Sequence, residues 1–353
     1  MKIAKIMIYG AGAIGRGYLA PIFYQRGHQI FFVEKNKSVL KELKSRDKNN
    51  YQTAIIENGE QKLKEIKFDE VFSFGEENDI IKDMDIIMLC VGVNNVAEVA
   101  PKLKDAKSIV CFENDYHSVN EIKKLSGNNN VYFGIPDVIV SNSSQWRLYR
   151  NDPLCVVAEE GELLFEKGNY ILDEDIKQLD TNELKEYWAC KFYIHNTLHA
   201  VLAYLGSEKG LKYIHESIEN SEINSKMNKI LSSIRNSLIK KKIVSPEMVS
   251  YYIERELKRF SNPLLVDPIS RVAREPIRKL RSHDRLIVPL RLMQECNEDI
   301  SGICEIISKV LDYNPPKKND EIYTLRKVIG KEGILREVSE ICENEEMFSK
   351  LLG

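Results

Sequence analysis

Three polar residues occur at spacings suited to acid–base chemistry inside an otherwise apolar segment. Lys191, Asn196 and His199 belong to the stretch 191–200, KFYIHNTLHA, which we interpret as the start of a long apolar helix. At about 100° per residue, their side chains fall within an arc of about 140° and share one face. Burial is costly unless these groups bind each other or a ligand, and it favours the neutral lysine that a general base requires. The pattern therefore predicts a catalytic face, with a satisfied core histidine and a snorkelling lysine as the alternative.

A fourth candidate lies where a predicted strand ends. The strand predicted over residues 108–114 finishes in Glu113 and Asn114. An asparagine at the functional edge of a sheet can donate a hydrogen bond to a substrate oxygen. The alternative is that Asn114 only forms a turn.

The segment from Arg271 to Arg285 is locally basic, with six basic residues against two acidic ones. Because arginine forks match phosphate oxygens, this segment predicts a phosphorylated substrate. The alternative is a solvated surface. The candidate substrate-binding residues in this segment are Arg274, Arg278, Lys279 and Arg285.

A glycine-rich segment near the start of the chain indicates a nucleotide site. Gly10, Gly12 and Gly15 stand between a strand-like run, residues 3–9, and a helix-like run. The first glycine permits a tight turn, the second lets backbone amides approach phosphates, and the third lets helix and strand pack closely. We expect the pyrophosphate of a dinucleotide at Gly10, Ala11, Gly12, Ala13, Ile14 and Gly15.

The next predicted strand, residues 28–34, ends in an acidic residue that bears on the choice of cofactor. Glu34 follows Gly15 by 19 residues, which is about where an acid binds the ribose hydroxyls. A carboxylate there favours NAD over NADP. Lys35 and Lys37 follow directly and could instead serve a 2′-phosphate, so this alternative stays open.

The elements that position these residues divide into two regions. In the first half, strand-like and helix-like runs alternate, which is typical of a parallel sheet covered by helices. We expect residues 51–57 and 70–75 at the rim of that sheet, and residues 154–159 and 162–166 as a closing hairpin. After about residue 179 the periodicity becomes helical. The fold class is therefore α/β, with an NAD-binding Rossmann-like doubly wound domain at 1–180 and a helical substrate and catalytic domain at 181–353.

Composition excludes several classes of partner. The 353 residues carry a net charge of −2, so no global field recruits nucleic acid or an anionic membrane surface. The apolar stretch from Ile86 to Val93 is too short to span a bilayer. Seven cysteines without a CxxC pair fit a reducing cytoplasm, and no histidine or cysteine set suggests a metal site.

Five segments resemble the polyol-specific long-chain dehydrogenases, the mannitol dehydrogenase family. The Lys-x4-Asn-x2-His pattern followed by RKL and DRLI is the specific part of the resemblance. The matching segments are GAGAIGRGY at 10–18, the pair Val91 and Gly92, CFEN at 111–114, KFYIHNTLHAVLAYLG at 191–206 and the block at 259–290.

The resemblance implies an NAD-dependent enzyme that interconverts a sugar-alcohol phosphate and a keto-sugar phosphate, with mannitol 1-phosphate and fructose 6-phosphate as the expected pair. It implies that Lys191 is the general base, that Asn114 and Asn196 stabilise the developing alkoxide, and that His199 orients the substrate. No metal is expected, and the chain is expected to be a monomer or a small homo-oligomer. The resemblance adds Val91 and Gly92 to the cofactor site and Asp137 to the substrate site.

Two other functions remain open from the sequence. A ketopantoate-reductase-like NADPH enzyme also begins with GAGAIG and carries a catalytic lysine on a helical domain, although the block at 259–290 counts against it. The other is a cofactor-binding regulatory protein that has lost catalysis. Val138 and Leu198, which depart from the family pattern, favour that reading.

Overall fold

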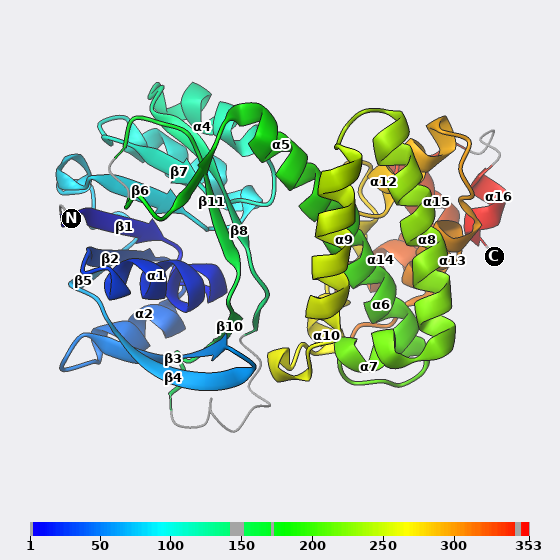
Figure 1. Ribbon diagram of the computed structural model, residues 1–353, viewed down its shortest axis with the longest axis horizontal. Helices are drawn as coiled ribbons and strands as arrows, with labels where there is room; N and C mark the ends of the chain where they lie inside the picture. The colour runs from blue at the N-terminus through cyan, green and yellow to red at the C-terminus, as the bar shows by residue number, and fades with distance from the viewer. Residues whose placement is uncertain (1–2, 142–151, 171–172, 343–346, 353) are drawn as a thin grey trace. The chain divides into compact units, whose positions relative to one another are not determined.

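The computed structural model describes residues 3–141, 152–170, 173–342 and 347–352 (Figure 1). It separates into two compact units, Met1–Leu184 and Lys185–Gly353, which we call the N-terminal and C-terminal units. This division falls within helix α5 (Thr181–Cys190).

The N-terminal unit is built on a mainly parallel sheet, which confirms the predicted fold class. Neighbouring strands from β5 through β2, β1, β6 and β7 to β8 all pair in parallel, whereas β11 runs antiparallel to β8. Within the described residues the sheet has eight strands, in the order β12 (Lys177–Leu179), β11 (Glu162–Glu166), β8 (Val131–Asp137), β7 (Ile109–Cys111), β6 (Ile86–Leu89), β1 (Lys5–Tyr9), β2 (Gln29–Glu34) and β5 (Glu70–Ser73).

The central strands have the sequence of strands covered on both faces. β6 reads IIML and is fully buried, as expected for a parallel strand with helices on both sides. Tyr9 at the end of β1 pairs with Val33 on one side and Leu89 on the other. Their carboxyl ends therefore share one edge of the sheet, where Gly10, Glu34 and Cys90 follow.

A second sheet corrects two expectations, the place of residues 51–57 at the rim and the hairpin of residues 154–159 and 162–166. Residues 51–57 belong to β3 (Asn50–Glu57), which does not join the main sheet and pairs with β4 (Glu60–Lys67) and β10 (Val157–Glu159). Strands β10 and β11 do not form the expected hairpin, because β10 pairs with β3 and β9 (Val140–Ser141) while β11 pairs with β8. The short link at Glu160 and Gly161 therefore passes the chain from one sheet to the other. The segment 70–75 does lie at the rim, as β5.

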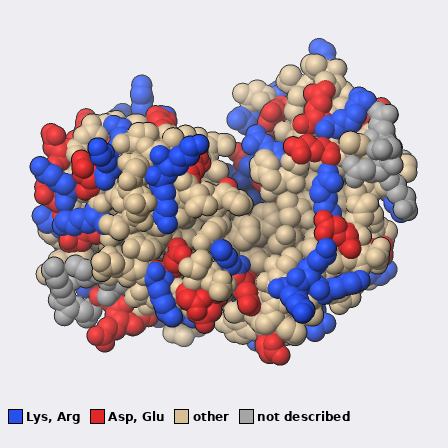
Figure 2. All heavy atoms as spheres, turned by 90° about the horizontal axis from the view of Figure 1, so that it is seen from above, with Lys and Arg blue, Asp and Glu red and all other residues tan. Residues whose placement is uncertain are grey.

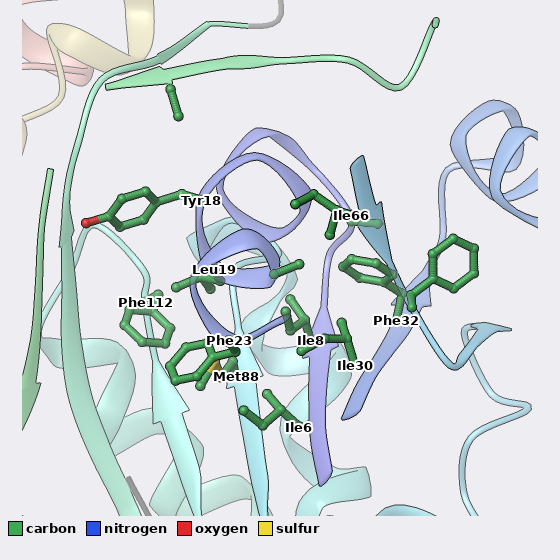
Figure 3. Close-up of a cluster of buried hydrophobic side chains, with 14 of the residues drawn as sticks. Ile6, Ile8, Tyr18, Leu19, Phe23, Ile30, Phe32, Ile66, Met88 and Phe112 are labelled. Atoms are coloured by element: carbon green, nitrogen blue, oxygen red, sulfur yellow. The ribbon is translucent and has the colours of Figure 1, made fainter. Parts of the chain in front are cut away.

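Figure 3 shows how the helix after the glycine segment packs on the sheet. The chain makes a π-helical turn, Gly15–Leu19, and continues as α1 (Ala20–Gln25). Leu19 and Phe23 are fully buried against Ile8 of β1 and Met88 of β6. This packing fixes the glycine segment relative to the strand ends. The other helices of the unit are α2 (Lys37–Lys44), α3 (Val96–Val99) and α4 (His117–Ser126), with short 3₁₀ turns at Ile81–Asp83, Val93–Asn95 and Ala100–Leu103.

The C-terminal unit is helical, as predicted. Its described residues contain no strand, only an isolated bridge between Tyr213 and Pro268. Its helices are α6 (Thr197–Glu208), α7 (Ile214–Glu219), α8 (Ser221–Lys240), α9 (Pro246–Phe260), α10 (Ile269–Val272), α11 (Pro276–Lys279), α12 (Ile287–Glu295), α13 (Ser301–Asp312), α14 (Glu321–Val328), α15 (Gly330–Glu337) and α16 (Met347–Leu352), with a 3₁₀ turn at Pro263–Leu265.

The helix that carries the catalytic candidates starts earlier than expected. It begins with α5 at Thr181, passes through a π-helical turn at Lys191–Asn196 and continues as α6. Lys191 therefore lies in the middle of the helical stretch rather than at its start. The ten residues Thr197–Gly206 of α6 are all buried, and the polar His199 is among them.

Two surface properties agree with the composition. On the face drawn in Figure 2, lysine and arginine side chains are interspersed with aspartate and glutamate. In the described parts of the chain, no helix is long and apolar enough to cross a membrane.

Candidate active site

A cavity of about 460 Å³ opens beside the glycine segment in the N-terminal unit. It lies where the carboxyl ends of β1, β2 and β6 meet, which is where open α/β sheets bind their ligands. Apolar side chains and the glycine segment supply much of its wall. The lining residues are Tyr9, Gly10, Gly12, Arg16, Val33, Glu34, Lys35, Asn36, Val39, Phe74, Cys90, Val91, Asn95, Glu98 and Val99.

Backbone geometry explains two of the glycines. Gly10 has φ of 91°, and a Cβ there would lie 2.5 Å from the Cys90 carbonyl oxygen. A Cβ on Gly15 would lie 2.1 Å from the Gly10 carbonyl oxygen, so helix and turn could not approach as they do. Around Gly12, by contrast, no described atom lies within 4 Å of such a Cβ. The space beside the segment is therefore filled at Gly10 and Gly15, whereas at Gly12 it is open towards the cavity.

Glu34 lies at the wall of this cavity. Its Oε1 accepts hydrogen bonds from the backbone amides of Lys35 at 2.8 Å and Asn36 at 2.7 Å. Those bonds fix the carboxylate at the end of β2. The ammonium of Lys35 pairs with the Glu98 carboxylate at 2.6 Å, so its charge is already compensated.

The backbone amides of Val91 and Gly92 point to a carboxylate that the sequence argument did not use. Both donate to Oε1 of Glu113, at 2.7 and 3.0 Å. Burial raises the pKa of Glu113 to about 7, although the two amide bonds act in the opposite direction. Val91 still lines the cavity, but the two N–H groups serve Glu113. The sequence signal was Glu113 itself, which stands directly before Asn114 in the segment CFEN.

Two predicted substrate residues of this unit differ in exposure. Asn114 follows β7 and is exposed, so its amide is accessible for a ligand. Asp137 ends β8 and is only 1% exposed. The two side chains thus face different environments at the ends of adjacent strands.

In the C-terminal unit, the π-helical turn orders the catalytic candidates. Hydrogen bonds from residue i to residue i+5 bring Lys191 and Asn196 towards the same side of the helix, and such turns are frequent at functional sites. Lys191 is half-buried, whereas Asn196 is buried. The Nδ2 group of Asn196 has no hydrogen-bond partner among the described residues. A buried amide donor left in this state is costly unless a ligand satisfies it.

His199 is held by a carboxylate that the sequence did not identify. Its Nε2 lies 2.6 Å from Oδ2 of Asp267, and Oδ1 of Asp267 accepts from Arg271 at 2.6 and 2.8 Å. Burial lowers the pKa of His199 to about 4, so the ring is neutral near pH 7, and the Arg271 charge holds the pKa of Asp267 below its usual range. With Nε2 donating to Asp267, Nδ1 is the acceptor and can accept a hydrogen bond from a hydroxyl group.

A second histidine–carboxylate pair lies beside the first. Nδ1 of His195 lies 2.5 Å from Oε2 of Glu256, a fully buried carboxylate that also pairs with Arg259. The rings of His195 and His199 are 5.1 Å apart, and both contact Phe260. This pair was missed because its partners are 61 residues apart in the sequence.

The basic segment meets the same helix. Thr197, next to Asn196, donates through Oγ1 to the Arg285 carbonyl oxygen at 2.8 Å. The Arg285 guanidinium bonds to Asp284, and Arg278 pairs with Glu275 at 3.2 Å. Arg274 is exposed. Asn196, His199 and the basic segment are therefore brought together in this unit.

Lys279 occupies an unusual position for a phosphate ligand. It is 1% exposed, its Nζ donates to the Arg274 carbonyl oxygen, and it lies over the Tyr204 ring. Within the described residues, no carboxylate lies at ion-pair distance from it. Burial and the charges of Arg285 and Arg278 lower the pKa of Lys279 well below its ordinary range.

The described residues contain no group of three His, Cys, Asp or Glu side chains that could hold a metal ion. The polar groups around Asn196 and His199 are amide, imidazole and cationic groups together with the carboxylates of Asp267 and Glu256. Their chemistry is hydrogen bonding and proton transfer.

Comparison with protein families gives two matches that together span most of the chain. Residues 4–115 match the mannitol dehydrogenase Rossmann domain, and residues 183–348 match the mannitol dehydrogenase C-terminal domain. Both the glycine segment and the helical stretch with Lys191, Asn196 and His199 lie inside these matches.

Similar proteins cover the chain almost end to end. It is 29% identical to a mannitol-1-phosphate 5-dehydrogenase of Thermoanaerobacter pseudethanolicus, covering 99% of this chain and 96% of that protein. It is 27% identical to the Clostridium acetobutylicum protein of the same name, covering 97% and 95%. The structure of Pseudomonas fluorescens mannitol 2-dehydrogenase with NAD and D-mannitol is similar in fold, with a TM-score of 0.75 and 14% identity, covering 99% of this chain and 91% of that chain.

Proposed function

This chain belongs to the mannitol dehydrogenase family, and from that premise we propose that it is an NAD-dependent oxidoreductase that interconverts mannitol 1-phosphate and fructose 6-phosphate. The related proteins named above are named for this activity, and the similarity covers nearly their whole length. The reaction oxidises a secondary alcohol to a ketone, so it needs a base for the hydroxyl proton and donors for the reacting oxygen.

The observation that carries the proposal is the buried amide of Asn196 without a partner among the described residues, on the same helical stretch as Lys191 and His199. Lys191 takes the hydroxyl proton as general base. Asn196 and Asn114 donate hydrogen bonds to the oxygen as it gains negative charge. His199, fixed in one tautomer by Asp267, accepts from a substrate hydroxyl through Nδ1 and orients it.

The N-terminal cavity fits the dinucleotide. Glu34 keeps Oε2 for ribose hydroxyls, since its Oε1 is occupied by backbone amides. Lys35 forms an exposed ion pair with Glu98, and the Glu34 carboxylate at the cavity wall supports NAD over NADP. When bound, the nicotinamide ring accepts the hydride from the alcohol carbon.

The substrate phosphate is assigned to the basic segment. Arg278 on α11 and Arg285 before α12 are half-buried and can present guanidinium groups to an anion, as can the exposed Arg274. Lys279 lies deeper and supplies a cation that an anion would stabilise. Asp137 remains a candidate for a sugar hydroxyl.

The two alternative functions are less well supported. Both family matches are to mannitol dehydrogenase domains, which favours a polyol substrate over ketopantoate. A protein without catalysis has no need for the unsatisfied Asn196 amide or for the His199–Asp267 pair.

We assign the reaction to the cytoplasm and expect a monomer or a small homo-oligomer. The seven cysteines are all free thiols, and burial raises the pKa of Cys90 and Cys111, which keeps them protonated and unreactive. Light scattering coupled to size-exclusion chromatography measures the oligomeric state.

The proposal predicts the effect of Lys191→Ala. Without the general base, kcat for fructose 6-phosphate reduction should fall by about 10²-fold or more, while the Kd for NADH stays within about twofold of the wild-type value. Steady-state kinetics and NADH fluorescence titration measure the two quantities. Lys209→Ala, in the surface ion pair at the end of α6, is the matched control and should leave both unchanged. Near-wild-type kcat for Lys191→Ala would refute the assigned mechanism.

A further inference from the structure

Arg16 is a buried cation at the wall of the nucleotide cavity. It follows Gly15 in the π-helical turn and is 6% exposed. Its Nε donates to the Leu154 carbonyl oxygen at 2.7 Å, and its Nη1 donates to the Ala11 carbonyl oxygen. Both partners are neutral backbone groups. The guanidinium therefore lies against the turn that joins Gly10 to Gly12, at the cavity wall.

The charge of Arg16 has no direct counterpart in the described part of the chain. No carboxylate there lies within ion-pair distance of the guanidinium, and Glu34 and Asp152 act on it only from further away. Both of these acids have nearer partners: Glu34 accepts from two backbone amides, and Asp152 pairs with Arg46 at 2.7 Å. A guanidinium stays charged in proteins, so its burial here is uncompensated.

The other described arginines of this unit differ from Arg16. Arg26 pairs with Asp175 at 2.6 Å and with Asp173 at 3.4 Å, and Arg46 pairs with Asp152. Both are more exposed than Arg16, at 28% and 24% of their side chains. The most deeply buried of the three is thus the one without a carboxylate. This is the arrangement expected where a ligand supplies the negative charge.

We propose that Arg16 is the counter-charge for the diphosphate of the bound dinucleotide, an assignment that rests on the proposed function and adds a residue to its cofactor site. A guanidinium has five N–H donors, and those not used by Leu154 and Ala11 have no partner among the described residues. Arg16 lines the cavity together with Gly10 and Gly12.

Binding measurements with three probes test this assignment without using catalysis. Adenosine, ADP-ribose and NADH are titrated into the wild-type protein, Arg16→Met and the control Arg26→Met, using calorimetry and ligand-observed NMR. For Arg16→Met we expect the Kd of ADP-ribose and NADH to rise tenfold or more, with adenosine within about twofold of wild type. Added NaCl should weaken ADP-ribose binding more steeply for the wild type than for Arg16→Met. The control should match the wild type throughout.

The contrary outcomes are distinct. An equal loss of adenosine and ADP-ribose binding would make Arg16 a structural residue and overturn the assignment, as would unchanged ADP-ribose binding. Should Arg16→Met fail to fold, Arg16→Gln decides, because it keeps an N–H donor but loses the charge: weaker ADP-ribose binding with unchanged adenosine binding supports the proposal, and unchanged ADP-ribose binding or an equal loss of both overturns it. Arg16-dependent ADP-ribose binding without NADH turnover would remove the proposed function and keep this inference.

Discussion

Hydrogen-bond partners decide what each candidate side chain can do. His199 is buried against an ionised Asp267, which fixes its proton on Nε2 and leaves Nδ1 as an acceptor. Asn196 has the opposite property, because its amide donor lacks a partner in the described residues. One residue is therefore prepared to accept a hydrogen bond from a substrate hydroxyl and the other to donate one. That combination suits a polyol, whose hydroxyl groups can both donate and accept hydrogen bonds.

Glu113 provides a prediction about pH. Burial raises its pKa from 4.5 to about 7 in the folded protein, so between these values the folded state binds more protons than the unfolded state. The contribution of Glu113 to stability therefore falls as pH rises through this window. Glu113→Gln removes it, and the free energy of unfolding should then decline less between pH 5 and 7.5, by at most about 1.4 kcal/mol per pH unit.

Urea denaturation at a series of pH values measures this difference. Glu121→Gln, an exposed carboxylate on neighbouring α4, is the control and should keep the wild-type slope. Because all other titrating groups are shared, only Glu113 can separate the two curves. Identical slopes for wild type and Glu113→Gln would contradict the assigned pKa.

At the residue scale, the sequence could identify groups with chemistry but not their partners. Asn196 and His199 stand out because polar side chains are rare in an apolar helix. Asp267 and Glu256 do not, since each becomes informative only when the fold brings it to a histidine 68 or 61 residues away.

Among the elements, α6 and the basic segment contact each other in the C-terminal unit. The π-helical turn changes the helix register at Lys191–Asn196, and Thr197 then bonds to the backbone of Arg285. The position of the arginines relative to Asn196 is thus fixed through the main chain. The Arg285 guanidinium bonds to Asp284 and Arg278 pairs with Glu275, so a ligand would share these side chains with the carboxylates.

The basic segment predicts how phosphate recognition is distributed. Arg278→Gln and Arg285→Gln should each raise KM for fructose 6-phosphate about tenfold or more with little change in kcat, because a phosphate contact acts equally in the ground and transition states. KM for free fructose should not change. Lys258→Gln, on the exposed side of α9, is the control. If both variants keep the wild-type KM for fructose 6-phosphate, the segment is a solvated surface.

Element types followed from periodicity more reliably than element partners did. Alternation of apolar and polar residues identified β3 as a strand, but its pairing with β10 joins residues about one hundred positions apart. The link at Glu160 and Gly161 looks like a hairpin turn, yet it connects strands of two different sheets. The π-helical turn was also missed, because an assumed 100° per residue cannot show an inserted residue.

For the whole molecule, the distribution of buried charge is more informative than the net charge of −2. Each unit buries one cation without a carboxylate at ion-pair distance in its described residues: Arg16 in the N-terminal unit and Lys279 in the C-terminal unit. We propose the first as the counter-charge for the diphosphate of a dinucleotide and the second for the phosphate of a sugar. An anion beside Lys279 would also offset the burial and the arginine charges that lower its pKa.

The most direct test of the central claim is kcat/KM for the reduction of fructose 6-phosphate and fructose, each with NADH and with NADPH. We predict that fructose 6-phosphate with NADH is preferred over fructose with NADH by about 10²-fold or more, because the phosphate gains charge-assisted hydrogen bonds that fructose lacks. NADH should be preferred over NADPH, because Glu34 repels a 2′-phosphate. Equal values for fructose and its phosphate, or no oxidation of NADH with fructose 6-phosphate, would contradict the account.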